Sequence, residues 1–232
     1  MLKLVALDMD GTLVDVASSW GAVHAYFGDS NTEGLQAFMD NRIDDAEFVR
    51  SDVRIWWRHR PRLSRGDLEE ILGLVPLMPG AHRLIDGLNE RGIRTAIVSG
   101  GVDVLAERIA RELGIDRVLA NGFETDGDGR LTGEGIIRVP IWGKEEVLAR
   151  LQAELGVVPA ETGSVGNSEI DVGLFRRSRV GVAFLPADET VRRGATAVVA
   201  ERDLGRVLPY LVGGSEEPPA TPAAPGSRAK LL

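Results

Sequence analysis

The amino-acid sequence predicts an α/β fold: a Rossmann-like parallel sheet with helices on both faces, plus a small helical cap inserted after the first strand. From Pro79 onward, apolar runs that end in glycine alternate with amphipathic helical segments. This alternation is typical of a parallel sheet built with right-handed crossovers. Residues 16–76 carry helical patterns and no strong strand. The 232 residues are 44% hydrophobic and 27% charged, a composition typical of one globular domain with a modest insert.

The first strand is expected at the apolar run 4–7, which leads directly into Asp8. A short apolar run bounded by a glycine turn is typical of a strand buried on both faces. Asp8 and Asp10 would lie at its C-terminal end, the edge at which open α/β sheets bind ligands. Two carboxylates one residue apart can hold a hard cation while one attacks an electrophile. Gly11 permits a sharp turn and Thr12 adds a hydroxyl, although an ordinary polar strand end is the alternative interpretation.

The insert, residues 16–76, is expected to contain four helices. Each begins at a side chain that can cap it: Ser18 or Ser19, Asn31, Asp44 and Ser64. The tryptophans Trp20, Trp56 and Trp57 are interpreted as the core of the insert in preference to ligand contacts.

The remaining chain is expected to alternate between strands and helices. Strands are expected at 93–98, 117–120, 162–165, 180–184 and 197–199, and helices at 80–91, 102–113, 144–155, 188–193 and 204–211. Residues 124–133 predict a β-hairpin turn. A calcium loop is disfavoured there because Arg130 and Leu131 occupy a ligand position and the glycine position. Residues 213–232 are rich in Gly, Ser, Glu, Pro and Ala, so a disordered tail is expected.

Three later segments add polar residues to the motif that begins at Asp8. Residues 97–101 end a strand in Ser-Gly-Gly, Gly143-Lys144 opens a helix, and residues 164–171 end a third strand in polar and acidic residues. A lysine in the first turn of a helix is unfavourable unless an anion lies nearby. In this order the four motifs resemble the haloacid dehalogenase superfamily of phosphotransferases, and within it the phosphoserine phosphatases. The resemblance extends from Leu4 to about Leu211.

The resemblance implies an Mg²⁺-dependent phosphomonoesterase that acts on a small anionic phosphate ester. Asp8 would be the nucleophile that forms an aspartyl-phosphate, and Asp10 would protonate the leaving alkoxide and then deprotonate water. Lys144 would offset the charge among Asp8, the phosphate and the metal. The resemblance implies phosphate contacts from Thr12, Ser99 and Gly100, and magnesium ligands from Asp8, Asp10, Asn167 and Asp171.

The resemblance also divides the chain into a core domain, residues 1–15 and 77–212, and a helical cap, residues 16–76, that selects the substrate. Phosphoserine enzymes of the family carry a cap glutamate shortly after the first motif, and here that position is Ala17. Arg50 is the counterpart of a cap arginine that binds a carboxylate. Arg54 is the other candidate, and a solvated arginine is the alternative interpretation. Asn167 stands where the family usually has a metal-binding aspartate, which predicts an active enzyme with a high Mg²⁺ requirement.

Composition limits the other possibilities. The net charge of −8 argues against nucleic acids and anionic membranes as partners, and the absence of cysteine excludes disulfides and thiolate chemistry. The N-terminal residues lack a signal-peptide pattern, so a cytoplasmic location is expected. The alternative functions are a phosphatase of a sugar phosphate or phosphoglycolate, and a weakly active or non-catalytic phosphate-binding protein. The physiological substrate and the oligomeric state, monomer or homodimer, stay open.

Overall fold

The computed structural model describes residues 1–213, and its centre is a seven-stranded sheet in the order β4-β3-β2-β1-β5-β6-β7. The strands are β1 (Leu4–Leu7), β2 (Arg94–Val102), β3 (Arg117–Thr125), β4 (Leu131–Ile136), β5 (Thr162–Gly166), β6 (Val180–Phe184) and β7 (Ala197–Val199). All neighbours pair in parallel except β3 and β4. The predicted parallel α/β sheet is confirmed. The predicted tail, residues 213–232, lies outside the described residues except for Gly213.

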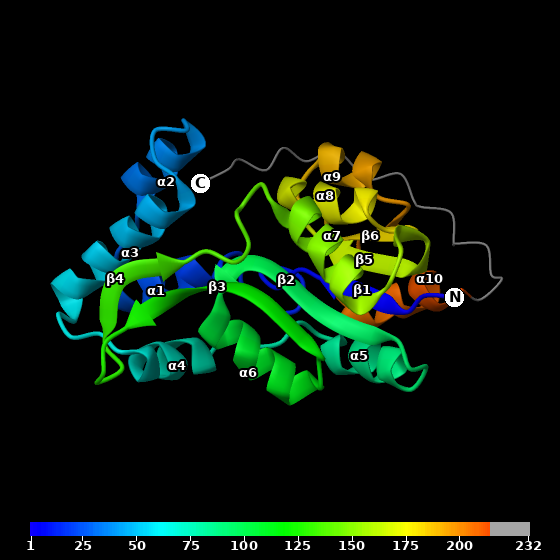
Figure 1. Cartoon of the computed structure of the whole chain (residues 1–232), viewed down its shortest axis with the longest axis horizontal. Coiled ribbons are helices and arrows are strands. Elements are labelled where there is room, and N and C mark those ends of the chain that lie inside the picture. The colour runs from blue at the N-terminus through cyan, green and yellow to red at the C-terminus, as the bar shows by residue number, and fades with distance from the viewer. Residues whose placement is uncertain (214–232) are drawn as a thin grey trace.

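Helices cover both faces of the sheet because side chains along each strand alternate in direction. Val5 and Leu7 of β1 share an apolar core with α5 (Ala81–Asn89) and α6 (Asp103–Leu113), whereas Leu4 and Ala6 face α7 (Lys144–Leu155) and α8 (Val172–Arg176). Figure 1 shows α5 and α6 below the strands, and α7 to α9 (Glu189–Gly194) above them. In the described part of the chain, no helix is long and apolar enough to cross a bilayer.

Four helices lie between β1 and the start of α5: α1 (Ser19–Phe27), α2 (Thr32–Met39), α3 (Asp45–His59) and α4 (Arg65–Gly73). Their N-terminal N–H groups are capped by the side chains of Ser18, Asn31, Asp44 and Ser64, as the sequence predicts. Trp56 is fully buried, and its ring lies against those of Trp20 and Phe123, with centroids 6.0 and 5.8 Å away. The insert therefore packs directly on β3 through aromatic side chains.

Several element boundaries differ from the sequence prediction. β2 continues to Val102 and β3 to Thr125, and β3 turns into β4, which the sequence did not predict as a strand. Asp126 Oδ1 accepts hydrogen bonds from two backbone N–H groups in the turn, so the hairpin is closed locally. The predicted helix 204–211 is a 3₁₀ turn (Leu204–Val207) followed by α10 (Leu208–Val212), because Pro209 has no N–H to continue a helical hydrogen-bond ladder.

The sheet places the functional motifs at one edge. β1 pairs with β2 on one side and β5 on the other, with Leu7 opposite Ile97 and Val165. The residues that follow these three positions therefore lie at the C-terminal edge of the central strands, where parallel sheets bind ligands.

Candidate active site

A buried lysine lies between two carboxylates at the end of β1. Lys144 Nζ donates hydrogen bonds to Asp8 Oδ1 and to Asp171 Oδ1, each at 2.6 Å. All three side chains are buried. Lys144 is the first residue of α7, where it is unfavourable with respect to the helix dipole, and the two carboxylates stabilise it there.

Burial and neighbouring charges set the protonation of this cluster. Burial raises the pKa of the Asp8 carboxyl to about 7; the Asp171 charge adds to this rise and Lys144 opposes it. Burial alone would lower the pKa of Lys144, but the charges of Asp171 and Asp8 outweigh it and raise that pKa above its ordinary value. Lys144 therefore stays charged, while Asp8 requires a further cation nearby to be fully ionised at neutral pH.

Asp171 anchors the loop that follows β5. Its Oδ2 accepts hydrogen bonds from the backbone of Asn167 at 3.0 Å, from the backbone of Ser168 at 2.9 Å and from the Ser168 hydroxyl at 2.9 Å. Its other oxygen binds Lys144. Both oxygens have protein donors, so Asp171 anchors Lys144 and the loop; its role as a magnesium ligand stays a prediction.

Asp10 is oriented by Ser19 at the start of α1. Asp10 Oδ2 accepts hydrogen bonds from the Ser19 backbone and hydroxyl, both at 2.8 Å. Asp10 Oδ1 is buried and has no hydrogen-bond partner among residues 1–213. Burial raises the pKa of Asp10, and the bonds from Ser19 counteract part of this rise. A Cβ atom on Gly101 would lie 2.7 Å from the Ser19 hydroxyl, so a glycine is required beside this pair.

The predicted phosphate-binding residues differ in their placement. Ser99 is buried at the end of β2, and its hydroxyl accepts a hydrogen bond from Gly101 N at 3.1 Å. Gly100 lies on the wall of the main cavity. Thr12 is fully buried, and within the described chain its hydroxyl has no hydrogen-bond partner.

A cavity of about 640 Å³ lies between the strand ends and the insert. Asp8, Asp10, Gly100 and Asn167 form its strand-end wall. The opposite wall comes mainly from α1 and α3 and includes Ala17, Trp20, His24, Asp45, Phe48 and Asp52. The cavity therefore places the carboxylates of β1 opposite side chains that could bind the rest of a small molecule.

Arg50 and Arg54, the predicted carboxylate-binding arginines, are not among the residues that line this cavity. Arg50 instead binds Glu47 at 2.8 Å and Glu134 of β4 at 2.6 Å, and Arg54 also pairs with Glu47. The structure therefore does not bring Arg50 to the site.

His24, Asp45 and Asp52 also line the cavity, and the sequence did not predict them there. A local signal existed for Asp52, which lies on the buried face of α3 beside Val49, Val53 and Trp56. An acidic residue among apolar residues at helical spacing is unusual and indicates a specific partner.

The strand-end wall offers oxygen atoms to a divalent cation. No described residue donates a hydrogen bond to Asp8 Oδ2 or to the buried Asp10 Oδ1. Asn167 lines the cavity beside them, and a Cβ atom on Gly11 would lie 2.2 Å from its Nδ2. In the part of the chain that the structure covers, no three His, Cys, Asp or Glu side chains form a metal site. Two carboxylates and an amide suit Mg²⁺, which keeps several waters and prefers oxygen ligands.

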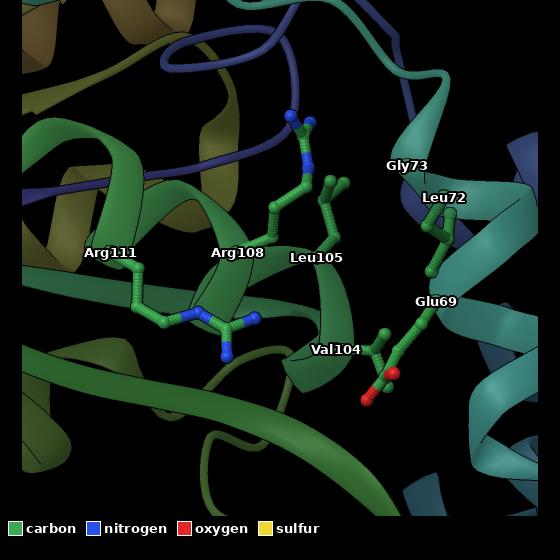
Figure 2. A pocket seen from close by; sticks show the side chains of 7 residues that line it. All are labelled: Glu69, Leu72, Gly73, Val104, Leu105, Arg108 and Arg111. Carbon is green, nitrogen blue, oxygen red and sulfur yellow. The ribbon is translucent and has the colours of Figure 1, made fainter.

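A second, smaller hollow of about 140 Å³ lies between α4 and α6. Figure 2 shows Glu69 and Leu72 on one side and Arg108 and Arg111 on the other. Arg108 donates to the Val75 carbonyl at 2.6 Å and to Glu112 at 3.1 Å. The strand-end residues Asp8, Asp10 and Asn167 do not reach this hollow, so it is separate from the main cavity.

Comparison with known proteins gives one consistent family. The model of the haloacid dehalogenase-like hydrolase family matches residues 5–176. A protein of Streptococcus thermophilus named phosphoserine phosphatase is 34% identical over 213 residues, which cover 90% of this chain and 95% of that protein. Another of that name, from Streptomyces coelicolor, is 32% identical over 219 residues. The match covers 93% of this chain and about half (51%) of that relative.

Solved structures have the same fold. A phospho-aspartyl intermediate analogue of phosphoserine phosphatase superposes with a TM-score of 0.74 at 25% identity, over 90% of this chain and 99% of the other. A substrate-bound phosphoserine phosphatase complex gives a TM-score of 0.75 at 24% identity, over 91% of this chain and 99% of the other.

Proposed function

Because this chain belongs to the haloacid dehalogenase-like hydrolase family and is a phosphatase of the phosphoserine phosphatase-like kind, we propose that it hydrolyses small phosphate monoesters with Mg²⁺ through a phosphate bonded to Asp8. One observation carries this proposal. Asp8 lies on the cavity wall with Oδ1 bound by Lys144, while no described residue donates to Oδ2. A carboxylate held at one oxygen and available at the other is suited to nucleophilic attack.

The first half of the reaction transfers the phosphoryl group to the protein. An oxygen of Asp8 forms a bond to phosphorus as the bond between phosphorus and the ester oxygen breaks. Asp10 donates a proton to the departing alkoxide, and burial, which raises the pKa of Asp10, favours the protonated form that this step needs.

The second half releases phosphate and restores Asp8. Asp10, now ionised, accepts a proton from a water molecule whose oxygen bonds to phosphorus as the bond to Asp8 breaks. Lys144 keeps Asp8 in position in both halves. Mg²⁺, held by Asp8, Asp10 and Asn167, would supply positive charge that offsets the charge of the phosphoryl oxygens.

In this proposal the core, residues 1–15 and 77–212, carries the reaction, and the cap, residues 16–76, selects the substrate. Ser99, Gly100 and Thr12 stay predicted contacts of the phosphoryl oxygens. The names of the relatives make phosphoserine the first substrate to test, followed by sugar phosphates and phosphoglycolate.

A weakly active or non-catalytic phosphate-binding protein is the second candidate. It is favoured by Asn167, an uncharged side chain beside only two cavity carboxylates on the strand-end wall. A protein of this kind would bind phosphate esters without turnover.

The experiment uses p-nitrophenyl phosphate as a general substrate. Wild-type protein should release nitrophenol with Mg²⁺ and not with a chelator, and Asp8→Asn should release none while keeping the wild-type circular dichroism spectrum. Acid-quenched wild type, mixed with ³²P-labelled substrate, should carry protein-bound label that hydroxylamine removes. Wild-type turnover by Asp8→Asn would contradict the covalent mechanism, and binding of phosphate without hydrolysis at any Mg²⁺ concentration would support the second candidate.

A further inference from the structure

The cap side of the main cavity carries negative charge and aromatic surface without a compensating cation. Asp45 and Asp52 of α3 line it together with Trp20 and Phe48. No lysine or arginine is found among the described residues that line the cavity. A substrate group bound there meets carboxylates, neutral polar side chains such as His24 and Asn31, and apolar side chains.

Asp52 is buried, with 2% of its surface exposed, and only one of its oxygens is engaged by the protein. Its Oδ1 accepts hydrogen bonds from His24 Nε2 at 2.8 Å and from Asn31 Nδ2 at 2.7 Å. No residue from 1 to 213 donates a hydrogen bond to Oδ2. Because Asp52 also lines the cavity, this oxygen is available to a ligand.

His24 does not neutralise Asp52. The indole Nε1 of Trp56 donates a hydrogen bond to His24 Nδ1 at 3.2 Å, and an indole N–H can only donate. His24 Nδ1 is therefore the acceptor nitrogen, its single proton is on Nε2, and the ring is neutral. Asp52 is consequently a buried carboxylate without a cationic partner in the described chain, an arrangement that is costly until a cation binds.

The surroundings of Asp52 suit an alkyl ammonium group. Asp45 adds a second carboxylate, fixed by a 2.9 Å hydrogen bond from Ile141 N to its Oδ1. Trp20 is held by a 3.0 Å hydrogen bond from its Nε1 to the Gly100 carbonyl, and both Trp20 and Phe48 have aromatic faces that attract cations. Leu35, Val49 and Ile137 add apolar wall that would pack against a hydrocarbon spacer.

The same wall disfavours a carboxylate on the substrate. Such a group would lie near Asp45 or Asp52 with no arginine or lysine to bind it, and like charges in a desolvated site repel strongly. Arg50 is engaged by Glu47 and Glu134 away from the cavity.

We propose that the substrate is the phosphate monoester of an amino alcohol, with a protonated amine at the end of an apolar spacer and no carboxylate, and that Asp52 binds the amine. The inference rests on the phosphatase function proposed above and narrows its substrate. It separates this chain from an enzyme specific for phosphoserine, whose substrate carries a carboxylate beside the amine.

A matched pair of esters tests the amine. The specificity constant kcat/KM is measured for 3-aminopropyl phosphate and for n-propyl phosphate, with phosphoserine and p-nitrophenyl phosphate alongside. We expect the aminopropyl ester to exceed the propyl ester by about tenfold or more, since a charge-assisted hydrogen bond has this strength. We also expect it to exceed phosphoserine.

The variant Asp52→Asn tests whether Asp52 is the residue that selects the amine. Asparagine keeps an oxygen for His24 and Asn31, and its amide nitrogen replaces the oxygen that has no protein donor, so the fold is preserved. This variant should lose the preference, so that its kcat/KM for the aminopropyl ester no longer exceeds its kcat/KM for the propyl ester. Glu47→Gln, on the same helix but away from the cavity, is the matched control and should change none of the four values.

The outcomes separate this inference from the proposed function. Equal kcat/KM values for the two propyl esters, a clear preference for phosphoserine, or an equal loss on both propyl esters in Asp52→Asn would overturn the inference and leave the phosphatase function intact. Failure of the wild type to hydrolyse p-nitrophenyl phosphate would instead contradict the proposed function. Calorimetric binding of the same two esters then decides the inference: tighter binding of the amine that Asp52→Asn abolishes supports it, and equal affinities overturn it.

Discussion

Ser19 donates both its backbone N–H and its hydroxyl to one oxygen of Asp10, each at 2.8 Å. The same hydroxyl accepts a hydrogen bond from Val102 N at 3.0 Å. Because Ser19 begins α1 and Val102 ends β2, one buried serine joins the helical insert, the central sheet and the carboxyl group proposed as the acid and base. The orientation of Asp10 therefore depends on the position of the first cap helix.

Ser19→Ala should lower kcat by about tenfold or more with a smaller change in KM, because Asp10 loses one of the two bonds that orient it. It should also reduce the free energy of unfolding by about 1–3 kcal/mol, because Val102 N is left without its acceptor. Steady-state kinetics and urea unfolding measure both effects. Ser18→Ala is the control: it removes the α1 cap at a cost of about 1 kcal/mol and leaves the bonds to Asp10 in place. Equal kcat values in the two variants would contradict a positioning role for Ser19.

Lys144→Met should abolish turnover and reduce stability by about 3–5 kcal/mol, because Asp8 and Asp171 would be buried near each other without their shared cation. The double variant Lys144→Met/Asp171→Asn removes one of the repelling charges. It should therefore be more stable than the sum of the two single variants predicts, by at least about 1 kcal/mol. Chemical denaturation of the four proteins in the cycle measures this coupling, and additive losses would show that the triad is not one electrostatic unit.

Metal-free protein should lose stability as the pH rises towards alkaline values. The pKa of Asp8 is raised to about 7 in the folded state, from an unfolded value of 3.8. A raised carboxyl pKa contributes stability that is fully present below the unfolded pKa and is lost as the pH rises through the folded pKa. Asp8→Asn lacks this contribution, so with a chelator present the Tm of the variant should rise relative to that of the wild type between about pH 5 and about pH 8, by an amount that corresponds to about 2–3 kcal/mol in stability.

Added Mg²⁺ at the upper pH should raise the wild-type Tm more than that of Asp8→Asn, because the cation binds the ionised carboxylate. Differential scanning calorimetry in chelator and in Mg²⁺ gives both comparisons. Parallel Tm curves for the two proteins across this pH range would mean that Asp8 does not titrate there.

Arg50→Ala should change kcat/KM by less than about twofold for every ester, whether or not the ester carries a carboxylate. Its guanidinium binds Glu47 and Glu134 outside the cavity, and solvent-screened ion pairs of this kind contribute little to stability. A selective rise in KM for carboxylated esters would restore the role that the sequence predicts for this arginine.

Most strands of the sheet could be predicted from the sequence, because the patterns that mark them lie within short segments of the chain. Apolar runs mark β1 and β6, and glycines at helix ends mark α6 and α7. Parallel pairing then requires Asp8 and Asn167 to lie at one edge, whatever the rest of the chain does. The hairpin β3–β4 was only partly predicted, because Gly133, Glu134 and Gly135 give β4 a composition that is typical of a loop.

The cap contacts could not be predicted in the same way. Helical spacing places Arg50 and Asp52 two residues apart on α3, but it does not show which of them faces the cavity. That depends on Glu134, which belongs to the unpredicted strand β4, and on His24 and Asn31, which come from other parts of the cap. Helical spacing could mark Asp52 as a buried acid, but its partners and its place in the cavity required the tertiary structure, whereas the strand-end residues did not.

Asn167 is the uncharged member of the three ligands in the proposed magnesium site. Its backbone is fixed on both sides: its N–H donates to Asp171 Oδ2 at 3.0 Å, and its carbonyl accepts from Ala187 N at 2.8 Å. Its side chain lies against Gly11 on the cavity wall, near Asp8 and Asp10. A substitution here changes the charge at the site without moving the loop.

Asn167→Asp should lower the Mg²⁺ concentration for half-maximal activity by about tenfold, because the charge of the ligands tunes the affinity of oxygen sites for divalent cations. The same change should lower the Tm of the metal-free protein, since a third carboxylate then lies beside Asp8 and Asp10 without a cation. A charge control is Glu169→Gln, which alters an exposed acid nearby that does not line the cavity. Activity and Tm are titrated with Mg²⁺ in all three proteins. If wild type and Asn167→Asp share one Mg²⁺ midpoint, residue 167 is not a metal ligand, and the metal must be held by Asp8 and Asp10 alone.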